Sequence, residues 1–145
     1  MSKTIFPPSI KSRPVYATLE PRPGIAHVVI ADGEGAEALV DLLAKAPDRA
    51  AMLAQMHILY TPGPTGTDQW AAVQTLGAAQ SYRAPTIPAM LPRLAKVVAE
   101  AHMGTQFYLT GTEGLIGQAE REIMMTGLPF AAIQKEHRGS TLRRV

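Results

Sequence analysis

One stretch decides the fold of this sequence: FYLTGTEGLIGQAEREIMMTGLP, residues 107–129. It begins with three residues that favour strands, turns at Gly111, and continues with apolar residues at helical spacing. Thr112 stands where a helix cap belongs, and Gly127 with Pro129 predicts the end of the helix. Residues 130–136 follow as a closing strand. This order is typical of a parallel sheet that presents a helix N-terminus to a phosphate.

The rest of the chain shows the same alternation. Apolar runs predict buried strands at 26–31 and 56–60, and a short edge strand at 80–83. Between them, helices are predicted at 36–45, 47–53, 68–76 and 87–101. Strands that alternate with helices indicate one α/β domain of the Rossmann-like or flavodoxin-like class. We therefore expect a five-stranded, mostly parallel sheet with helices on both faces.

Two segments flank this domain, which we expect to span residues 25–137. Residues 1–24 hold five of the twelve prolines, which predicts an extended arm with apolar anchors. Residues 138–145 form a basic tail that carries Arg138, Arg143 and Arg144. Both segments are expected to dock onto partners, with solvated termini as the alternative.

Composition excludes several classes of function. The net charge is only +2, so no nucleic-acid partner is expected. The chain has no cysteine, which excludes disulfides, a thiolate nucleophile and cysteine-held metal centres, and which fits a cytoplasmic protein. No apolar run is long enough to span a membrane, so no membrane partner is expected. The four histidines lack metal-ligand spacing, and no catalytic set of residues is apparent.

Residues 107–136 resemble the end of the nicotinamide-binding domain of ferredoxin reductases. In that family a strand ends in a Cys-Gly-Pro-type turn, a helix follows, and the final strand carries a glutamate. Gly111 matches the glycine and Glu136 the glutamate, whereas Thr110 and Thr112 replace the cysteine and the proline. Together with residues 136–145, the stretch resembles more closely the family of small reductase-like subunits of bacterial dimethylamine monooxygenases.

This resemblance implies a subunit of a multi-component, NADPH-dependent monooxygenase that demethylates dimethylamine oxidatively. The subunit would act in electron transfer or complex assembly, and another subunit would oxidise the substrate. NADPH is the nucleotide implied for this chain, and a flavin, haem or iron centre is expected on partner subunits or segments. Residues 1–24 are too few for the flavin-binding barrel of complete ferredoxin reductases. Two alternatives stay open: a non-catalytic scaffold that binds a partner through the acidic turn 32–37, and a stand-alone flavodoxin-like protein.

Three loops at the carboxyl edge of the predicted sheet are candidates for binding the nucleotide. Glycines in the turn after strand 26–31 let a backbone approach a pyrophosphate, although Asp32, Glu34 and Glu37 bring negative charge there. Each feature has a structural alternative. The turn after strand 26–31 could be a plain sheet-edge turn, loop 61–67 a rigid linker, and the segment around Arg83 a surface loop. The candidate cofactor-binding residues are Gly33, Gly35, Thr61, Gly63, Thr65, Arg83, Gly111, Thr112 and Glu113.

Overall fold

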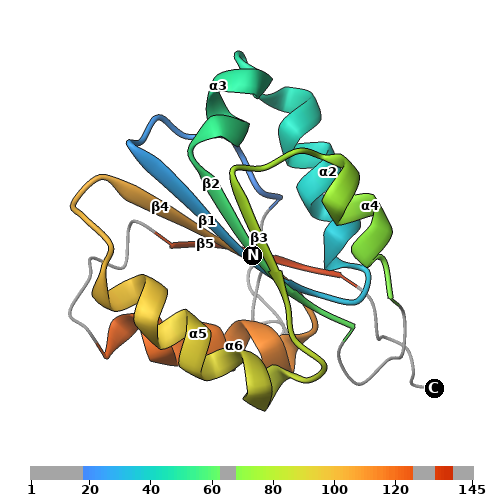
Figure 1. Ribbon diagram of the computed structural model, residues 1–145, viewed down its shortest axis with the longest axis vertical. Helices are drawn as coiled ribbons and strands as arrows, with labels where there is room; N and C mark the ends of the chain where they lie inside the picture. The colour runs from blue at the N-terminus through green and yellow to red at the C-terminus, as the bar shows by residue number, and fades with distance from the viewer. Residues whose placement is uncertain (1–17, 63–67, 126–132, 139–145) are drawn as a thin grey trace, which may run out of the picture.

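The computed structural model describes residues 18–62, 68–125 and 133–138 of this chain. Strands and helices alternate along it, as Figure 1 shows. The elements are β1 (Ala26–Asp32), α2 (Gly35–Lys45), α3 (Arg49–Ala54), β2 (Met56–Thr61), α4 (Trp70–Thr75), β3 (Gln80–Arg83), α5 (Ile87–Ala99), β4 (Thr105–Gly111), α6 (Glu113–Met124) and β5 (Ile133–His137).

The five strands form one sheet in the order β3-β2-β1-β4-β5, and each neighbouring pair is parallel. Val29 of β1 lies between Ile58 of β2 and Tyr108 of β4 in this register. From β1 the chain adds β2 and then β3 on one side of the sheet. It then returns to add β4 and β5 on the other side of β1. The switch point of the topology therefore lies between β1 and β4. The predicted five-stranded α/β fold is confirmed.

Helices cover both faces of the sheet, with α5 and α6 on one face and α2, α3 and α4 on the other (Figure 1). Alternate strand residues supply the two cores, because successive side chains of a strand point to opposite faces. Val28, Ile30 and Leu109 pack on the α5–α6 side, whereas Val29, Ile58 and Tyr108 pack on the α2 side. Burial on both faces explains why the central strands read as continuous apolar runs.

Three helices begin at side-chain caps. Asp48, Thr86 and Thr112 each accept a hydrogen bond from the backbone N–H three residues later. Proline is normally tolerated only in the first turn of a helix. Pro92 lies beyond the first turn of α5, and the helix still continues to Ala99. Met90 on the same helix is fully buried against the sheet, and such packing offsets the hydrogen bond that proline cannot make.

The end of the predicted arm packs on the domain. Leu19 is 1% exposed and belongs to the core on the α2 side of the sheet. Residues 1–17 lie outside the described residues, as do 63–67, 126–132 and 139–145, so the predicted helix stop at 127–129 is not described. Over the ranges that are described, no helix has both the length and the apolar character that crossing a bilayer demands.

Candidate functional site

The carboxyl ends of the strands meet at one edge of the sheet, which we call the carboxyl edge. There β1 ends at Asp32, β2 at Thr61 and β4 at Gly111. The candidate residues that this edge brings together are Gly33, Gly35, Thr61, Gly111, Thr112 and Glu113. Arg83 ends β3, two strands away from β1, and Gly63 and Thr65 lie outside the described residues.

A buried carboxylate bridges the switch point. Asp32 is 0% exposed, and its Oδ1 accepts a hydrogen bond from the Thr112 backbone N–H at 2.8 Å. Its Oδ2 accepts a second bond from the Thr112 hydroxyl, also at 2.8 Å. The same hydroxyl accepts from the Leu115 N–H at 3.2 Å and so caps α6. Asp32 therefore joins the end of β1 to the start of α6, across the crevice where open α/β sheets bind ligands.

Two of the candidate glycines lie in close contacts at this edge. Gly111 has a φ of 131°, and a Cβ there would lie 1.9 Å from Oδ1 of Asp32. A Cβ on Gly35, the first residue of α2, would lie 2.5 Å from the carbonyl oxygen of Thr110. Both glycines permit close approach, which the sequence analysis expected for a pyrophosphate. What approaches them in the structure is the protein itself, through a carboxylate and a carbonyl oxygen.

The turn after β1 is held by Tyr60, which sequence reasoning did not single out. The Tyr60 hydroxyl donates to the Gly33 carbonyl and accepts from the Gln69 N–H, each at 2.8 Å. Its ring stacks on Trp70 of α4, with ring centroids 6.3 Å apart. The Gly33 N–H donates to the Thr61 carbonyl at 2.9 Å. These contacts tie the turn to β2 and α4.

The electrostatics of the carboxyl edge are acidic. Burial raises the pKa of Asp32, while the hydrogen bonds from Thr112 act in the opposite direction. Glu34 in the turn after β1, Glu37 in the first turn of α2 and Glu113 at the start of α6 are exposed nearby, and Glu37 pairs with Arg138 at 3.6 Å. Arg83 pairs with Asp68 at 2.7 Å, so a phosphate would have to compete with a carboxylate for it.

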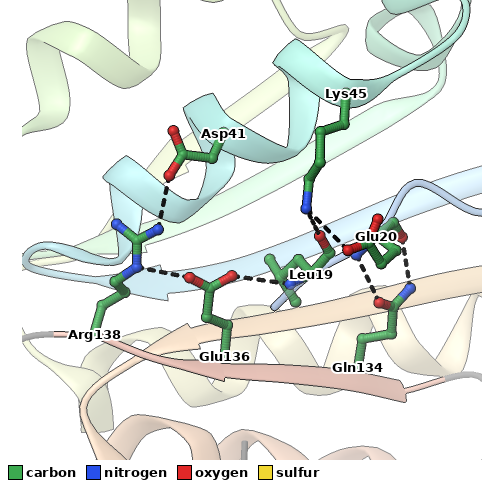
Figure 2. A network of polar contacts seen from close by, with 7 residues as sticks. All are labelled: Leu19, Glu20, Asp41, Lys45, Gln134, Glu136 and Arg138. Atoms are coloured by element: carbon green, nitrogen blue, oxygen red, sulfur yellow. Dashed lines mark hydrogen bonds and ion pairs between the residues drawn. The ribbon is translucent and has the colours of Figure 1, made fainter. Parts of the chain in front are cut away.

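Glu136, the counterpart of the terminal glutamate in the resembled reductases, anchors the segment 18–24 (Figure 2). Its Oε1 accepts from the Leu19 N–H at 2.9 Å, and its Oε2 accepts from Nε of Arg138 at 2.7 Å. Arg138 also pairs with Asp41 of α2 at 2.7 Å. Figure 2 shows these residues converging from β5, α2 and the segment before β1. Both carboxylate oxygens of Glu136 are thus engaged within the protein.

Replacing Glu136 by alanine should therefore loosen residues 18–24. The buried Leu19 N–H would lose its acceptor, and we expect a loss of about 1–3 kcal/mol in unfolding free energy. Amide hydrogen exchange at Leu19 and Glu20 should accelerate about tenfold or more. Glu136→Gln, which keeps an oxygen for the Leu19 N–H, is the matched control and should accelerate exchange much less. Equal exchange in both variants would show that the carboxylate does not hold this segment.

The described residues fit the phosphates of a dinucleotide poorly. Acidic side chains surround the glycine turns, and Asp32 occupies the space next to Gly111. Thr110 stands where the resembled family has its cysteine, but its hydroxyl is buried and makes no hydrogen bond within the described part of the chain. Nor do three or more metal-ligating side chains gather anywhere in those ranges. The candidate cofactor-binding residues stay a prediction.

Comparison with protein families gives one match over most of the chain. A family model described as "Dimethylamine monooxygenase subunit DmmA-like, N-terminal domain" matches residues 8–133. None of the curated proteins compared with the chain matches it in sequence.

Comparison with solved structures gives reductases. The ferredoxin reductase in carbazole 1,9a-dioxygenase is similar with a TM-score of 0.60 and 16% identity, over 81% of this chain and 36% of that one. Phthalate dioxygenase reductase is similar with a TM-score of 0.61 and 16% identity, over 85% of this chain and 38% of that one. The flavohaem-like FAD/NAD-binding domain of nitric oxide dioxygenase from Vibrio cholerae O1 biovar El Tor has a TM-score of 0.58 and 16% identity, over 88% of this chain and 56% of that one. The chain thus spans well under two thirds of the length of these structures, and the likeness establishes the fold.

Proposed function

This chain belongs to the dimethylamine monooxygenase subunit DmmA-like family, whose N-terminal domain it carries, and we propose that it is an assembly subunit of a monooxygenase that demethylates dimethylamine. Its fold is that of the FAD/NAD-binding domains of reductases. In this proposal the other subunits take electrons from NADPH and oxidise the substrate in the cytoplasm. Residues 25–137 form the body of the subunit in this proposal, and residues 1–24 and 138–145 flank it as the segments expected to dock. Of these flanking segments, residues 18–24 and Arg138 bind the domain of the chain itself.

The observation that carries an assembly role is the Asp32 bridge at the switch point. The position that receives a nucleotide in open α/β sheets holds a buried carboxylate bound to Thr112. Three exposed acids lie around it, Glu34, Glu37 and Glu113, of which Glu37 also pairs with Arg138. An acidic edge of this kind favours a basic protein surface over a phosphate, because opposite potentials speed docking and like charges repel. We therefore propose that the carboxyl edge faces a partner subunit.

Nucleotide binding by the chain itself is the second candidate. The observation in its favour is that the turns after β1 and β4 meet at the switch point, with the N-termini of α2 and α6 beside them. NADPH bound there would have to displace or accommodate the Asp32 carboxylate.

Binding kinetics with the purified remaining subunits of a dimethylamine monooxygenase test the assembly role. Glu34→Lys reverses one exposed charge at the carboxyl edge, and Glu100→Lys reverses one at the C-terminus of α5, near the opposite edge. We expect Glu34→Lys to lower the association rate about tenfold at low salt and Glu100→Lys to leave it nearly unchanged. Absence of a complex, or equal effects of the two reversals, would contradict the proposal.

A further inference from the structure

A shallow groove runs between α2 and α4 on the outer surface of the molecule. It is a hollow of about 480 Å³ lined by Ala36, Glu37, Val40, Asp41, Gln69 and Ala72. Val40 is 42% exposed, although it is a large apolar side chain. The groove thus combines an apolar floor with carboxylates on its rim, which suits a segment that carries both an apolar and a basic side chain.

Arg138 lies at the rim of this groove. Its guanidinium contacts Asp41 at 2.7 Å and Glu37 at 3.6 Å, and both of these acids line the groove. Its Nε is held by Glu136 at 2.7 Å. Three carboxylates therefore fix Arg138, the residue that directly precedes 139–145 in the sequence. Figure 2 shows the Arg138 side chain reaching from the end of β5 to Asp41 on α2.

We propose that residues 139–145 of the same chain dock in this groove. They carry two large apolar residues, Leu142 and Val145, with Arg143 and Arg144 between them. The four-residue step from Arg138 to Leu142 spans up to about 14 Å. That length is enough to cross α2, whose Glu37 and Asp41 side chains already contact Arg138. In the docked form Leu142 would cover Val40, and Arg143 and Arg144 would share the rim carboxylates Glu37 and Asp41 with Arg138.

Covalent connection strengthens this contact. A segment tethered at the rim has an effective concentration in the millimolar range or above, so a weak intrinsic affinity is enough to populate the docked form. Exposed charge pairs are screened by salt, so the docked population should fall as ionic strength rises. This inference does not rest on the proposed function, and it assigns residues 139–145 to a groove of their own chain instead of to a partner subunit.

Engineered disulfides test the contact directly, because the chain has no cysteine of its own. Val40→Cys with Leu142→Cys places one thiol in the groove and one on the docking segment. Met103→Cys with Leu142→Cys is the matched control, since Met103 is 88% exposed and precedes β4 near the opposite edge of the sheet. Oxidised glutathione accepts the two electrons as the two protein thiols join, and gel mobility with mass spectrometry follows the product.

We expect the first pair to form an intramolecular disulfide at least about tenfold faster than the control at low salt, because a disulfide needs its Cβ atoms within about 4.5 Å. Adding Arg143→Glu and Arg144→Glu, or 1 M salt, should remove most of that advantage. Equal rates for the two pairs would overturn the inference. So would a disulfide-linked dimer as the main product, which would assign the groove to a second copy of the chain.

Discussion

Replacing Gly111 by alanine will destabilise the protein by about 3 kcal/mol or more. The new Cβ would lie 1.9 Å from Oδ1 of the buried Asp32, and the backbone φ of 131° is one that residues with a side chain rarely adopt. Asp32 has no room to retreat, since Thr112 holds both of its carboxylate oxygens. Chemical denaturation followed by circular dichroism measures the loss.

Gly117→Ala is the control for this variant. Gly117 lies inside α6, and a Cβ there would meet nothing within 4 Å. Alanine should therefore stabilise the protein by about 0.5–1 kcal/mol, because glycine is the poorer helix former. If Gly111→Ala unfolds at the same denaturant concentration as Gly117→Ala, the close approach at the switch point is not real.

Replacing Asp32 by alanine will cost about 2–4 kcal/mol, because it leaves the buried N–H and hydroxyl of Thr112 without acceptors. Asp32→Asn keeps the shape and one acceptor oxygen, and it should be about 2 kcal/mol less damaging than Asp32→Ala at neutral pH. The measurement is again the free energy of unfolding. Equal losses in the two variants would mean that the bridge contributes through packing volume instead of hydrogen bonds.

The difference in unfolding free energy between the wild type and Asp32→Asn should change with pH in a defined direction. The pKa of Asp32 is raised by burial, so the folded protein holds the proton more tightly than the unfolded chain does. The contribution of Asp32 to stability is therefore greatest below the ordinary aspartate pKa of about 3.9 and declines as pH rises through the raised value. Asparagine does not titrate. The stability of the wild type relative to Asp32→Asn should accordingly fall with rising pH over that window, and an increase would contradict the assigned direction.

Most of the fold was predictable because it depends on local signals. The apolar runs at 26–31 and 107–110, the Thr112 cap and the glycine turns between them determine a strand–turn–helix order that admits few topologies. The packing of Leu19 was not predictable in this way. Its N–H bonds Glu136, which lies 117 residues further along the chain, and no local pattern reports such a contact.

The sequence predicted which candidate residues share one edge of the sheet, but it did not predict the contacts among them. Gly33, Gly35, Gly111 and Thr112 do meet at one edge, because parallel strands end together. Their sequence pattern, glycines before a helix, is the same whether a phosphate or a carboxylate of the protein approaches the backbone. The distinguishing signal was Asp32, an acid that ends a buried strand directly before the turn, because such a carboxylate needs hydrogen-bond donors inside the fold.

An NADPH titration followed by the amide NMR signals of the carboxyl edge tests this account most directly. The account assigns the switch point to the Asp32 bridge, so NADPH added to millimolar concentration should produce no saturable shift at Gly33, Gly35, Thr112 or Glu113. Saturable shifts confined to these four amides would contradict it and would make the chain a nucleotide-binding subunit.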